Sequence, residues 1–359
     1  MSRPYARPLD IKHGRIDLTH GAGGLASHQL VEQLFLPAWR STWAAQLPHD
    51  WADAQDDAAT LPPPPHLPAA HRWVMATDAH VVSPLFFPGG DIGQLAIYGT
   101  VNDLCMKGAT PCYLTVSFIL EEGLPLADLQ RVVQSMQAAA QQAQVAVVAG
   151  DTKVVERGKA DGLYISTAGL GWAPAQLAWR ASAAQAGDAI VISGTVGDHG
   201  VAILSQRQGL QFDSPITSDC AGLQDLVQSL RDSGLPIHTL RDPTRGGVAT
   251  ALNEIAQAAG VGVRLRERDI PVRNEVRAAC ELLGLDPLYL ANEGKCLVIC
   301  PADVAEAVLG LMRAHPLGQQ ACRIGDIVAC EHADVQLQTP FGGWRMLDWL
   351  MGDPLPRIC

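Results

Sequence analysis

Several aspartates of this chain follow an apolar segment and a turn that contains Gly or Asn. They are Asp57, Asp78, Asp103, Asp151 and Asp242. Carboxylates contributed by separate loops can together hold Mg²⁺, which in turn neutralises nucleotide phosphates. Each aspartate taken singly is more typical of a cap or a turn. Their number, beside glycine-rich loops that open helices, favours a site for ATP and Mg²⁺.

A glycine-rich segment, HGAGG at residues 20–24, precedes a helical pattern over residues 25–35. Glycines before a helix let the backbone approach an anion at the positive end of the helix dipole. The segment matches neither the P-loop nor the dinucleotide-binding fingerprint. By itself it is as consistent with a plain turn as with a phosphate cradle.

The chain ends on a thiol, Cys359, after a run that contains Pro354 and Pro356. These prolines disfavour helix, and eight extended residues from Gly352 to Cys359 would span roughly 26–29 Å. Such an arm could carry the thiol into a distant pocket, with Arg357 pairing with an acid or a phosphate. Taken alone, a terminal cysteine more often marks a frayed end.

The overall composition excludes several classes of protein. The chain has 359 residues and a net charge of −11, and the lack of a basic excess argues against non-specific binding to nucleic acid. We find neither an apolar run of membrane-spanning length nor a secretory signal, so we expect a cytoplasmic protein that does not bind membranes. Nine scattered cysteines fit a reducing compartment. Cys296 and Cys300 share one face of an expected strand, where small buried residues are more common than metal ligands.

The first half of the chain alternates expected strands and helices. Strands are predicted over 73–78, 113–120, 145–149 and 164–168. The strand at 145–149 runs into a turn at 150–153, and Asp91 lies in a turn that leads into a helix carrying residues 100–104. Residues Leu129, Val132, Val133, Met136 and Ala140 repeat at helical spacing and predict a second helix. A Pro- and Trp-rich stretch over 37–72 is interpreted as a long connection.

A second set of elements begins near residue 172. Strands are predicted over 189–193 and 296–300, and a helix opens after residues 240–247 with Thr244 as N-cap and Gly260 as C-cap. Antiparallel pairs with helices to one side suggest an α+β fold in two halves.

Seven motifs, in order along nearly the whole chain, resemble the HypE hydrogenase maturation proteins. The likeness is weakest over 37–72, where Asp56 could take the place of Asp57. The motifs are FFPGGDIG at 86–93, GTVND at 99–103, GDTKVV at 150–155, GDHG at 197–200, RDPTRGG at 241–247, ANEGK at 291–295 and PRIC at 356–359.

The resemblance implies a two-domain, PurM-like α+β fold of the aminoimidazole ribonucleotide synthetase and selenophosphate synthetase superfamily. Residues 1–172 would form an N-terminal domain for ATP binding and dimerisation. Residues 173–345 would form a C-terminal α/β domain, and 346–359 a mobile tail. Members of this superfamily typically form homodimers through the N-terminal sheets.

The resemblance also implies a reaction. A carbamoyltransferase, HypF, would place a carbamoyl group on Cys359, and ATP would then dehydrate the thiocarboxamide to a thiocyanate. The cyanide would pass through a HypC–HypD complex to the iron of a nascent [NiFe] hydrogenase. Phosphoryl transfer from ATP makes the carboxamide oxygen a good leaving group, and its catalysis depends mostly on positioning, Mg²⁺ and cationic groups.

Site residues follow from the same resemblance. Cys359, Glu293 and Lys153 would be catalytic, although Lys153 could equally clamp a phosphate and Glu293 could be an ion-pair partner. The candidate metal ligands are Asp57, Asp78, Asp103 and Asp242. The candidate nucleotide contacts are His20, Gly21, Gly23, Gly24, Asp91, Asn102, Asp151 and Thr152.

Two alternatives compete with this interpretation. A selenophosphate-synthetase-like kinase would place a catalytic cysteine near the N-terminal glycine-rich loop, but the first cysteine here is Cys105. A non-enzymatic carrier would present a modified Cys359 to partners without consuming ATP.

Overall fold

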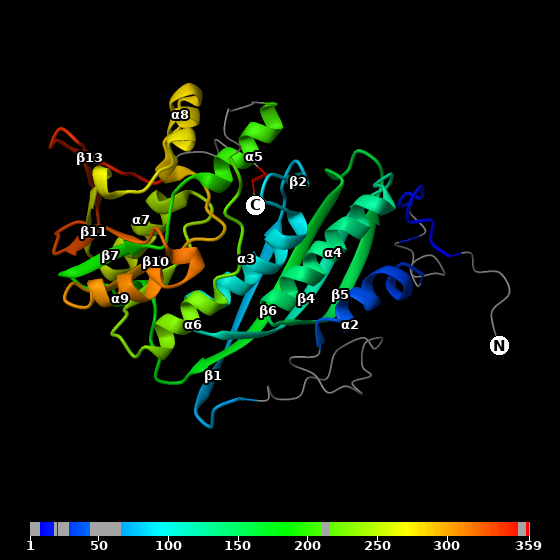
Figure 1. Ribbon diagram of the computed structural model, residues 1–359, viewed down its shortest axis with the longest axis horizontal. Helices are drawn as coiled ribbons and strands as arrows, with labels where there is room; N and C mark the ends of the chain where they lie inside the picture. Colours follow the sequence, from blue (N-terminus) through cyan, green and yellow to red (C-terminus); the bar gives the residue numbers. More distant parts are fainter. Residues whose placement is uncertain are drawn as a thin grey trace.

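Two sheets organise the molecule into two lobes that lie side by side (Figure 1). The computed structural model describes residues 8–17, 20, 29–43, 66–209, 216–350 and 357–358. Cys359, Asp56, Asp57, Gly21, Gly23, Gly24, Pro354 and Pro356 lie outside these residues. Within them, no helix has the length and apolarity needed to span a membrane.

The first lobe holds a four-stranded sheet in the order β1-β6-β4-β5, with β4 and β5 parallel and the other pairs antiparallel. The strands are β1 (His71–His80), β4 (Thr110–Glu121), β5 (Ala146–Val155) and β6 (Leu163–Pro174). Helices α3 (Ile92–Met106) and α4 (Leu126–Gln142) pack against each other and contact these strands. All five apolar positions predicted for the second helix are buried on α4. Smaller elements are η2 (Val31–Phe35, a π-helical turn), α2 (Leu36–Arg40), β2 (Phe86–Phe87) and β3 (Gly90–Asp91).

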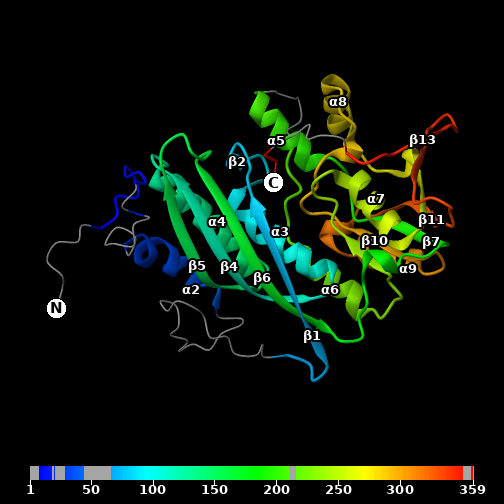
Figure 2. The ribbon, with the colours of Figure 1, turned by 180° about the vertical axis from the view of Figure 1, so that it is seen from behind.

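In the part of the chain that the structure describes, no helix covers the other face of this sheet, as Figure 2 shows. Side chains alternate between the two faces of a strand. Along β1 and β4 the outward positions include large apolar side chains. Trp73 is 48% exposed, Met75 74% and Ile119 41%. An apolar face of this kind indicates a site of association.

The second lobe holds a seven-stranded sheet in the order β13-β12-β9-β11-β7-β10-β8. Its strands are β7 (Asp188–Ile192), β8 (Thr239–Arg241), β9 (Gly262–Arg266), β10 (Leu297–Pro301), β11 (Cys322–Val328), β12 (Val335–Gln338) and β13 (Trp344–Met346). Its helices are α5 (Asp198–Gln208), α6 (Gln224–Asp232), α7 (Gly247–Ala259), α8 (Asn274–Leu283) and α9 (Ala305–Arg313). Single 3₁₀ turns are η5 (Ala181–Ala183), η6 (Glu267–Asp269), η7 (Pro287–Tyr289) and η8 (Pro316–Gly318).

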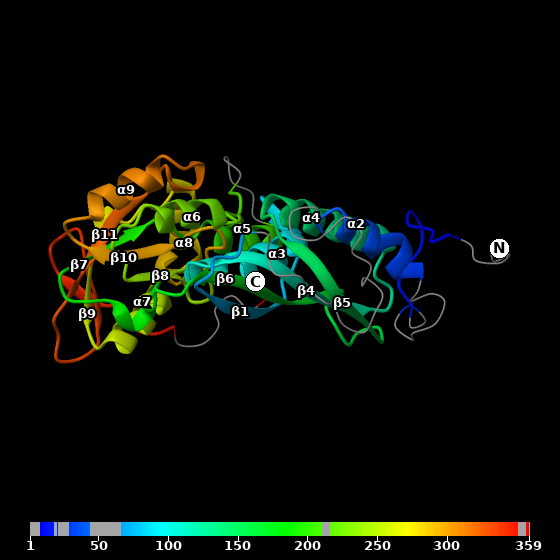
Figure 3. The ribbon, with the colours of Figure 1, turned by 90° about the horizontal axis from the view of Figure 1, so that it is seen from below.

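Helices cover both faces of the second sheet, and Figure 3 shows α9 and α7 on its opposite sides. Ile190 and Ile299 belong to the apolar cluster around α7. Val191 and Val298 belong to the cluster that includes α6 and α9. The expectation of helices to one side is therefore wrong for this lobe, because β7 and β10 carry apolar side chains on both faces. Cys296 and Cys300 are fully buried in the same cluster as Val298, which confirms their shared face.

Two local predictions are also wrong. Thr244 does not cap α7, which instead begins after Gly246 in a left-handed conformation, without a side-chain cap. Gly247 follows with φ +61°, and a Cβ there would meet the backbone of residues 288–290. Both features favour glycine at this position. Residues 150–153 are part of β5 rather than a turn. Gly260 is the left-handed C-cap of α7, as predicted.

The side-chain amide of Asn102 joins the lobes at their centre. Asn102 of α3 donates from Nδ2 to the carbonyl oxygens of Ala221 (3.0 Å) and Glu293 (3.2 Å). Its Oδ1 accepts from Leu223 N at 2.8 Å. Asn102 therefore holds two loops of the second lobe, 218–223 and 292–295, against the first lobe.

We predict that Gly294→Ala will destabilise the protein, because a Cβ at Gly294 would overlap the carbonyl oxygen of Asp219. Overpacking of this kind costs about 1–3 kcal/mol. The matched control is Gly310→Ala on α9, where a Cβ meets nothing within 4 Å and the change should stabilise by about 0.5–1 kcal/mol. Urea unfolding measures both, and equal stabilities of the two variants would contradict the packing of these loops.

Candidate active site

Three of the four predicted metal ligands line one cavity between the lobes. Asp78 comes from β1, Asp103 from α3, and Asp242 from the segment after β8. The cavity has a volume of about 380 Å³, and Arg241 and Arg245 also line it. Residues that are 164 positions apart in the sequence thus meet in one place.

Burial and the repulsion of neighbouring carboxylates make Asp103 and Asp242 hard to ionise. Burial first, and then the charges of Asp242 and Asp78, raise the pKa of Asp103 to about 7, although Arg241 and Arg245 act in the opposite direction. Burial also raises the pKa of Asp242. A bound cation would relieve this repulsion, and oxygen donors are what Mg²⁺ prefers.

The donor set therefore suits Mg²⁺ in chemistry. In the part of the chain that the structure describes, however, no three His, Cys, Asp or Glu side chains are close enough to form a ready metal site. The fourth candidate, Asp57, lies outside that part. The metal-binding role of the four aspartates stays a prediction.

Glu293 is a buried carboxyl group at the same junction. It is 5% exposed, and its Oε1 has no hydrogen-bond partner among the described residues. Burial, followed by the charges of Asp219, Asp242 and Asp78, raises its pKa well above the usual value. A buried carboxylate with a raised pKa and an uncommitted oxygen is suited to accept a proton.

Neighbouring residues hold the backbone around Glu293 in place. Asp219 Oδ1 accepts from Glu293 N at 3.0 Å, and Asp219 Oδ2 lies 3.3 Å from Lys295 Nζ. Asn292 accepts from Gly197 N at 2.8 Å and donates to the Pro243 carbonyl at 3.0 Å. The loop 292–295 therefore presents Glu293 from a rigid base.

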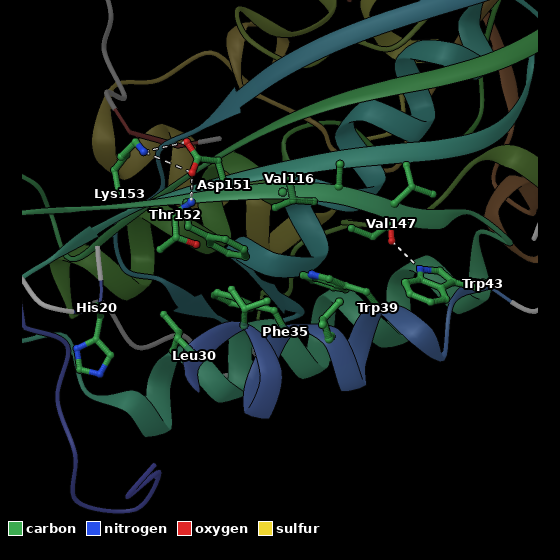
Figure 4. Close-up of a pocket in the computed structure, with 16 residues that line it drawn as sticks. His20, Leu30, Phe35, Trp39, Trp43, Val116, Val147, Asp151, Thr152 and Lys153 are labelled. Atoms are coloured by element: carbon green, nitrogen blue, oxygen red, sulfur yellow. Dashed lines mark hydrogen bonds and ion pairs between the residues drawn. The ribbon is translucent and has the colours of Figure 1, made fainter. Parts of the chain in front are cut away.

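A second cavity, of about 440 Å³, lies beneath β5 and includes His20 in its lining (Figure 4). Its walls are mainly apolar, with Phe35 and Trp39 opposite the strand. Asp151 and Lys153 form an exposed ion pair at 3.3 Å. Figure 4 shows this pair on the opposite side of β5 from Phe35 and Trp39.

The structure separates Lys153 from Glu293. Lys153 pairs in register with Ile119, which points to the open face of the first sheet. Among the described residues its ammonium group contacts only Asp151. Of the three residues predicted to be catalytic, Lys153 therefore lies on the open face of the first sheet and Glu293 at the junction between the lobes, and their roles stay predictions.

Two predicted nucleotide contacts have structural partners in this state. Asp91 is the N-cap of α3, where Oδ1 accepts from Gly93 N (2.7 Å), Gln94 N (3.1 Å) and Ser135 Oγ (2.5 Å). Asn102 joins the lobes as described above. That these two residues, together with His20, Asp151 and Thr152, bind nucleotide stays a prediction.

The last described residues dock beside this site. Arg357 pairs with Asp161, which confirms that this arginine can anchor the chain end to an acid. Ile358 is 8% exposed and forms a β-bridge with Val82. Figure 1 shows this segment between α5 and β2.

Sequence reasoning gave no role to His199, whose Nε2 lies 2.7 Å from the Ile358 carbonyl, or to Lys295 and Asp219, which hold the loop of Glu293. His199 and Lys295 both lie in motifs that carried the family resemblance. A polar residue inside an otherwise apolar helix start, as in GDHG before VAIL, is the signal that could have marked His199. No such signal marks Asp219, which lies in an ordinary polar loop.

Comparison with known proteins gives the same assignment for the whole chain. Family models described as AIR synthase related protein match residues 55–173 (N-terminal domain) and 185–338 (C-terminal domain). The carbamoyl dehydratase HypE of Cupriavidus necator is 56% identical over 355 residues, which are 99% of this chain and 98% of that protein. HypE of Escherichia coli K12 is 47% identical, over 96% of this chain and 99% of that protein.

The chain belongs to the HypE family.

Solved HypE structures agree with this assignment. A crystal structure of HypE in complex with ATP has a TM-score of 0.88 at 47% identity, over 95% of this chain and 99% of that chain. A HypE–HypF complex has a TM-score of 0.75 at 47% identity, over 77% of this chain and 90% of that chain. Thiamine-monophosphate kinase from Stenotrophomonas maltophilia, at 23% identity and a TM-score of 0.64, shares the fold. The predicted two-domain, PurM-like α+β fold is confirmed, while the exact domain bounds stay a prediction.

We predict that Asp103→Asn will flatten the dependence of stability on pH. A folded-state pKa of about 7 lies above the ordinary value near 3.8, so the folded state binds this proton more tightly. The contribution of Asp103 to stability is therefore fully present below pH 4 and is lost as the pH rises through 7. In metal-free buffer the variant should lose roughly 1–3 kcal/mol less than the unaltered chain between pH 4.5 and 8.

Urea unfolding at several pH values measures this difference. The control is Asp303→Asn, at an exposed position before α9, which should follow the unaltered chain. Superimposable profiles of Asp103→Asn and the unaltered chain would contradict the buried repulsion. Added Mg²⁺ should reduce the pH dependence of the unaltered chain more than that of the variant.

Proposed function

We propose that this chain is an ATP-dependent carbamoyl dehydratase that acts on the thiol of its own Cys359. The observation that carries the proposal is the docking of Arg357 and Ile358 beside the loops that hold Glu293. Ile358 precedes Cys359 directly, and its carbonyl lies 2.7 Å from Nε2 of His199, a residue linked through Ser218 and Asp219 to the backbone of Glu293. The frayed-end interpretation does not account for a buried Ile358.

The chemistry is a loss of water that ATP drives. The γ-phosphoryl group of ATP goes to the carbamoyl oxygen, and ADP leaves. The amide nitrogen gives up its two protons, one to Glu293 and the other to solvent, as the C–O bond breaks and phosphate departs with the oxygen. S–C(=O)–NH₂ thereby becomes S–C≡N, with ADP and phosphate as the other products.

Residues of both lobes divide this work. Mg²⁺, held by Asp78, Asp103 and Asp242 with Asp57, would neutralise the phosphate charge of ATP. Glu293, ionised in the active form, accepts a proton from the amide nitrogen. Its burial excludes water, which makes the carboxylate a stronger base than an exposed one.

The open face of the first sheet supports a homodimer. Trp73, Met75 and Ile119 leave an apolar surface that a second copy of this chain would cover. Lys153 lies on the same face, so pairing would direct it towards the other copy. This gives Lys153 a route to a phosphate or a proton that one copy does not provide.

The proposed reaction needs one partner that loads the chain end and another that unloads it. HypF loads the carbamoyl group, in keeping with the HypE–HypF complex solved for a relative, and a HypC–HypD complex accepts the cyanide for [NiFe] hydrogenase assembly. Both transfers require the chain end to leave its dock. The expected location of the protein is the cytoplasm.

We predict that chain carbamoylated at Cys359 will lose the mass of one water at that residue when given Mg-ATP, with release of one ADP. Glu293→Gln should lower this rate by about 10²–10⁴-fold, the usual contribution of a positioned base, with nearly unchanged ATP affinity. Mass spectrometry of the C-terminal peptide and an ADP assay give the result.

The control for this experiment is Glu281→Gln on α8, an exposed glutamate that should retain full activity. Loss of ATP binding in Glu293→Gln would make Glu293 a binding residue instead. ADP release without dehydration would indicate a kinase with another substrate. A carbamoylated tail with no ATP turnover would indicate a carrier.

We predict that Met75→Glu will convert a dimer into a monomer, because it places a charge in the apolar face of β1. Light scattering after size exclusion should give twice the chain mass for the unaltered protein and one chain mass for the variant. The control is Leu282→Glu on α8, which is also highly exposed (72%) but lies in the other lobe. A dimer that persists in Met75→Glu would rule out this face.

A further inference from the structure

The carbonyl groups of the last two described residues have several hydrogen-bond partners. The Arg357 carbonyl accepts from Arg207 Nη2 at 2.6 Å and from Ser83 N at 3.2 Å. The Ile358 carbonyl lies 2.7 Å from His199 Nε2. We call the residues that contact the chain end, namely Val82, Ser83, Asp161, His199 and Arg207, the dock. The dock therefore contacts the backbone of the chain end as well as its side chains.

These contacts differ in burial, and therefore in how much each one contributes to holding the chain end. The Arg357–Asp161 ion pair is nearly half exposed on both sides, and exposed pairs contribute about 0.2–1 kcal/mol. His199 is fully buried, so its hydrogen bond has no competition from water. An unpartnered buried carbonyl is expensive. The His199 contact should therefore dominate the dock.

Its geometry determines the tautomer of His199. Burial lowers the pKa of this imidazole, so one ring nitrogen carries a proton. A carbonyl oxygen only accepts hydrogen bonds, so Nε2 must be the donor to Ile358. Nδ1 then accepts from Ser218 Oγ at 2.8 Å, and Ser218 Oγ accepts from Cys220 N at 3.0 Å.

The same chain of contacts leads to Glu293. Ser218 is followed by Asp219, which accepts from Glu293 N at 3.0 Å. The ring of Phe87 packs edge-on against His199, with the centroids 5.6 Å apart, and limits its rotation. One loop thus holds both the imidazole that contacts the chain end and the carboxyl group that acts on it.

We propose that His199 is a positioning residue, which donates from Nε2 to the Ile358 carbonyl and so fixes the terminal residue relative to Glu293. This inference rests on the proposed function. A peptide carbonyl held in this way limits the positions open to the next side chain, and such alignment lowers the barrier of the chemical step. The contact is to backbone, so it does not depend on what the thiol carries.

The test compares His199→Ala, His199→Gln and His332→Ala in full-length carbamoylated protein. His332 is exposed and is the matched histidine control. In single turnover with saturating Mg-ATP, His199→Ala should dehydrate about tenfold more slowly, the factor that corresponds to roughly 1.4 kcal/mol. His199→Gln, whose amide can still donate, should recover part of the rate, while ATP affinity remains unchanged in all three.

A second readout does not involve the reaction. Carboxypeptidase should release Cys359 and Ile358 from uncarbamoylated His199→Ala about tenfold faster than from the unaltered chain. Asp161→Asn should change this release by no more than about threefold, because an exposed ion pair contributes little. His199→Phe retains the ring volume without a donor and replaces His199→Ala should the latter not fold.

The two readouts separate this inference from the proposed function. No dehydration in the unaltered chain would refute the function, yet faster release from His199→Ala would still establish the dock. Normal dehydration and normal release in His199→Ala and His199→Phe would overturn the inference alone. Slow dehydration that His199→Gln does not relieve, together with normal release, would also overturn it.

Discussion

The buried ion pair between Asp219 and Lys295 connects the parts of this molecule that matter for its chemistry. Asp219 is 3% and Lys295 11% exposed at the side chain, with 3.3 Å between the charged atoms. A buried pair is strongly destabilising to break, because the remaining charge is left without a partner. The pair joins loop 218–223, which contacts the imidazole of His199, to loop 292–295, which carries Glu293. The residue that contacts the chain end and the carboxyl group of Glu293 therefore share one rigid support.

Around this support the fold concentrates more negative charge than it neutralises. Asp78, Asp103 and Asp242 come from both lobes, and Arg241 and Arg245 balance them only in part. Burial, and then this excess of charge, raise the pKa of Asp103 and of Glu293, which is unfavourable for the isolated protein. The same excess makes the junction suited to a cation and a nucleotide, and to a carboxylate that takes up a proton. The buried carboxyl groups that suit the junction to its chemistry therefore lower the stability of the folded chain.

Much of the fold could be predicted from local pattern. The five apolar positions of α4 and the strand positions of β1 and β4 follow from periodicity, because one face of each element must be buried, whereas β7 is a continuous apolar run buried on both faces. The predicted turn at 150–153 was wrong because a glycine and an aspartate are turn residues locally. Pairing with β4 overrides that preference and extends β5 through them.

The sequence by itself determined the family, the residue types of the acidic loops and the terminal thiol, since each of these can be read from a short continuous segment. Only the tertiary structure decided which of them meet. Asp78, Asp103 and Asp242 converge because strand, helix and loop from two lobes end at one junction, whereas Lys153 turns to the open face because side chains alternate along β5. His199 receives Ile358 across 159 positions, and no sequence period encodes a contact of that range.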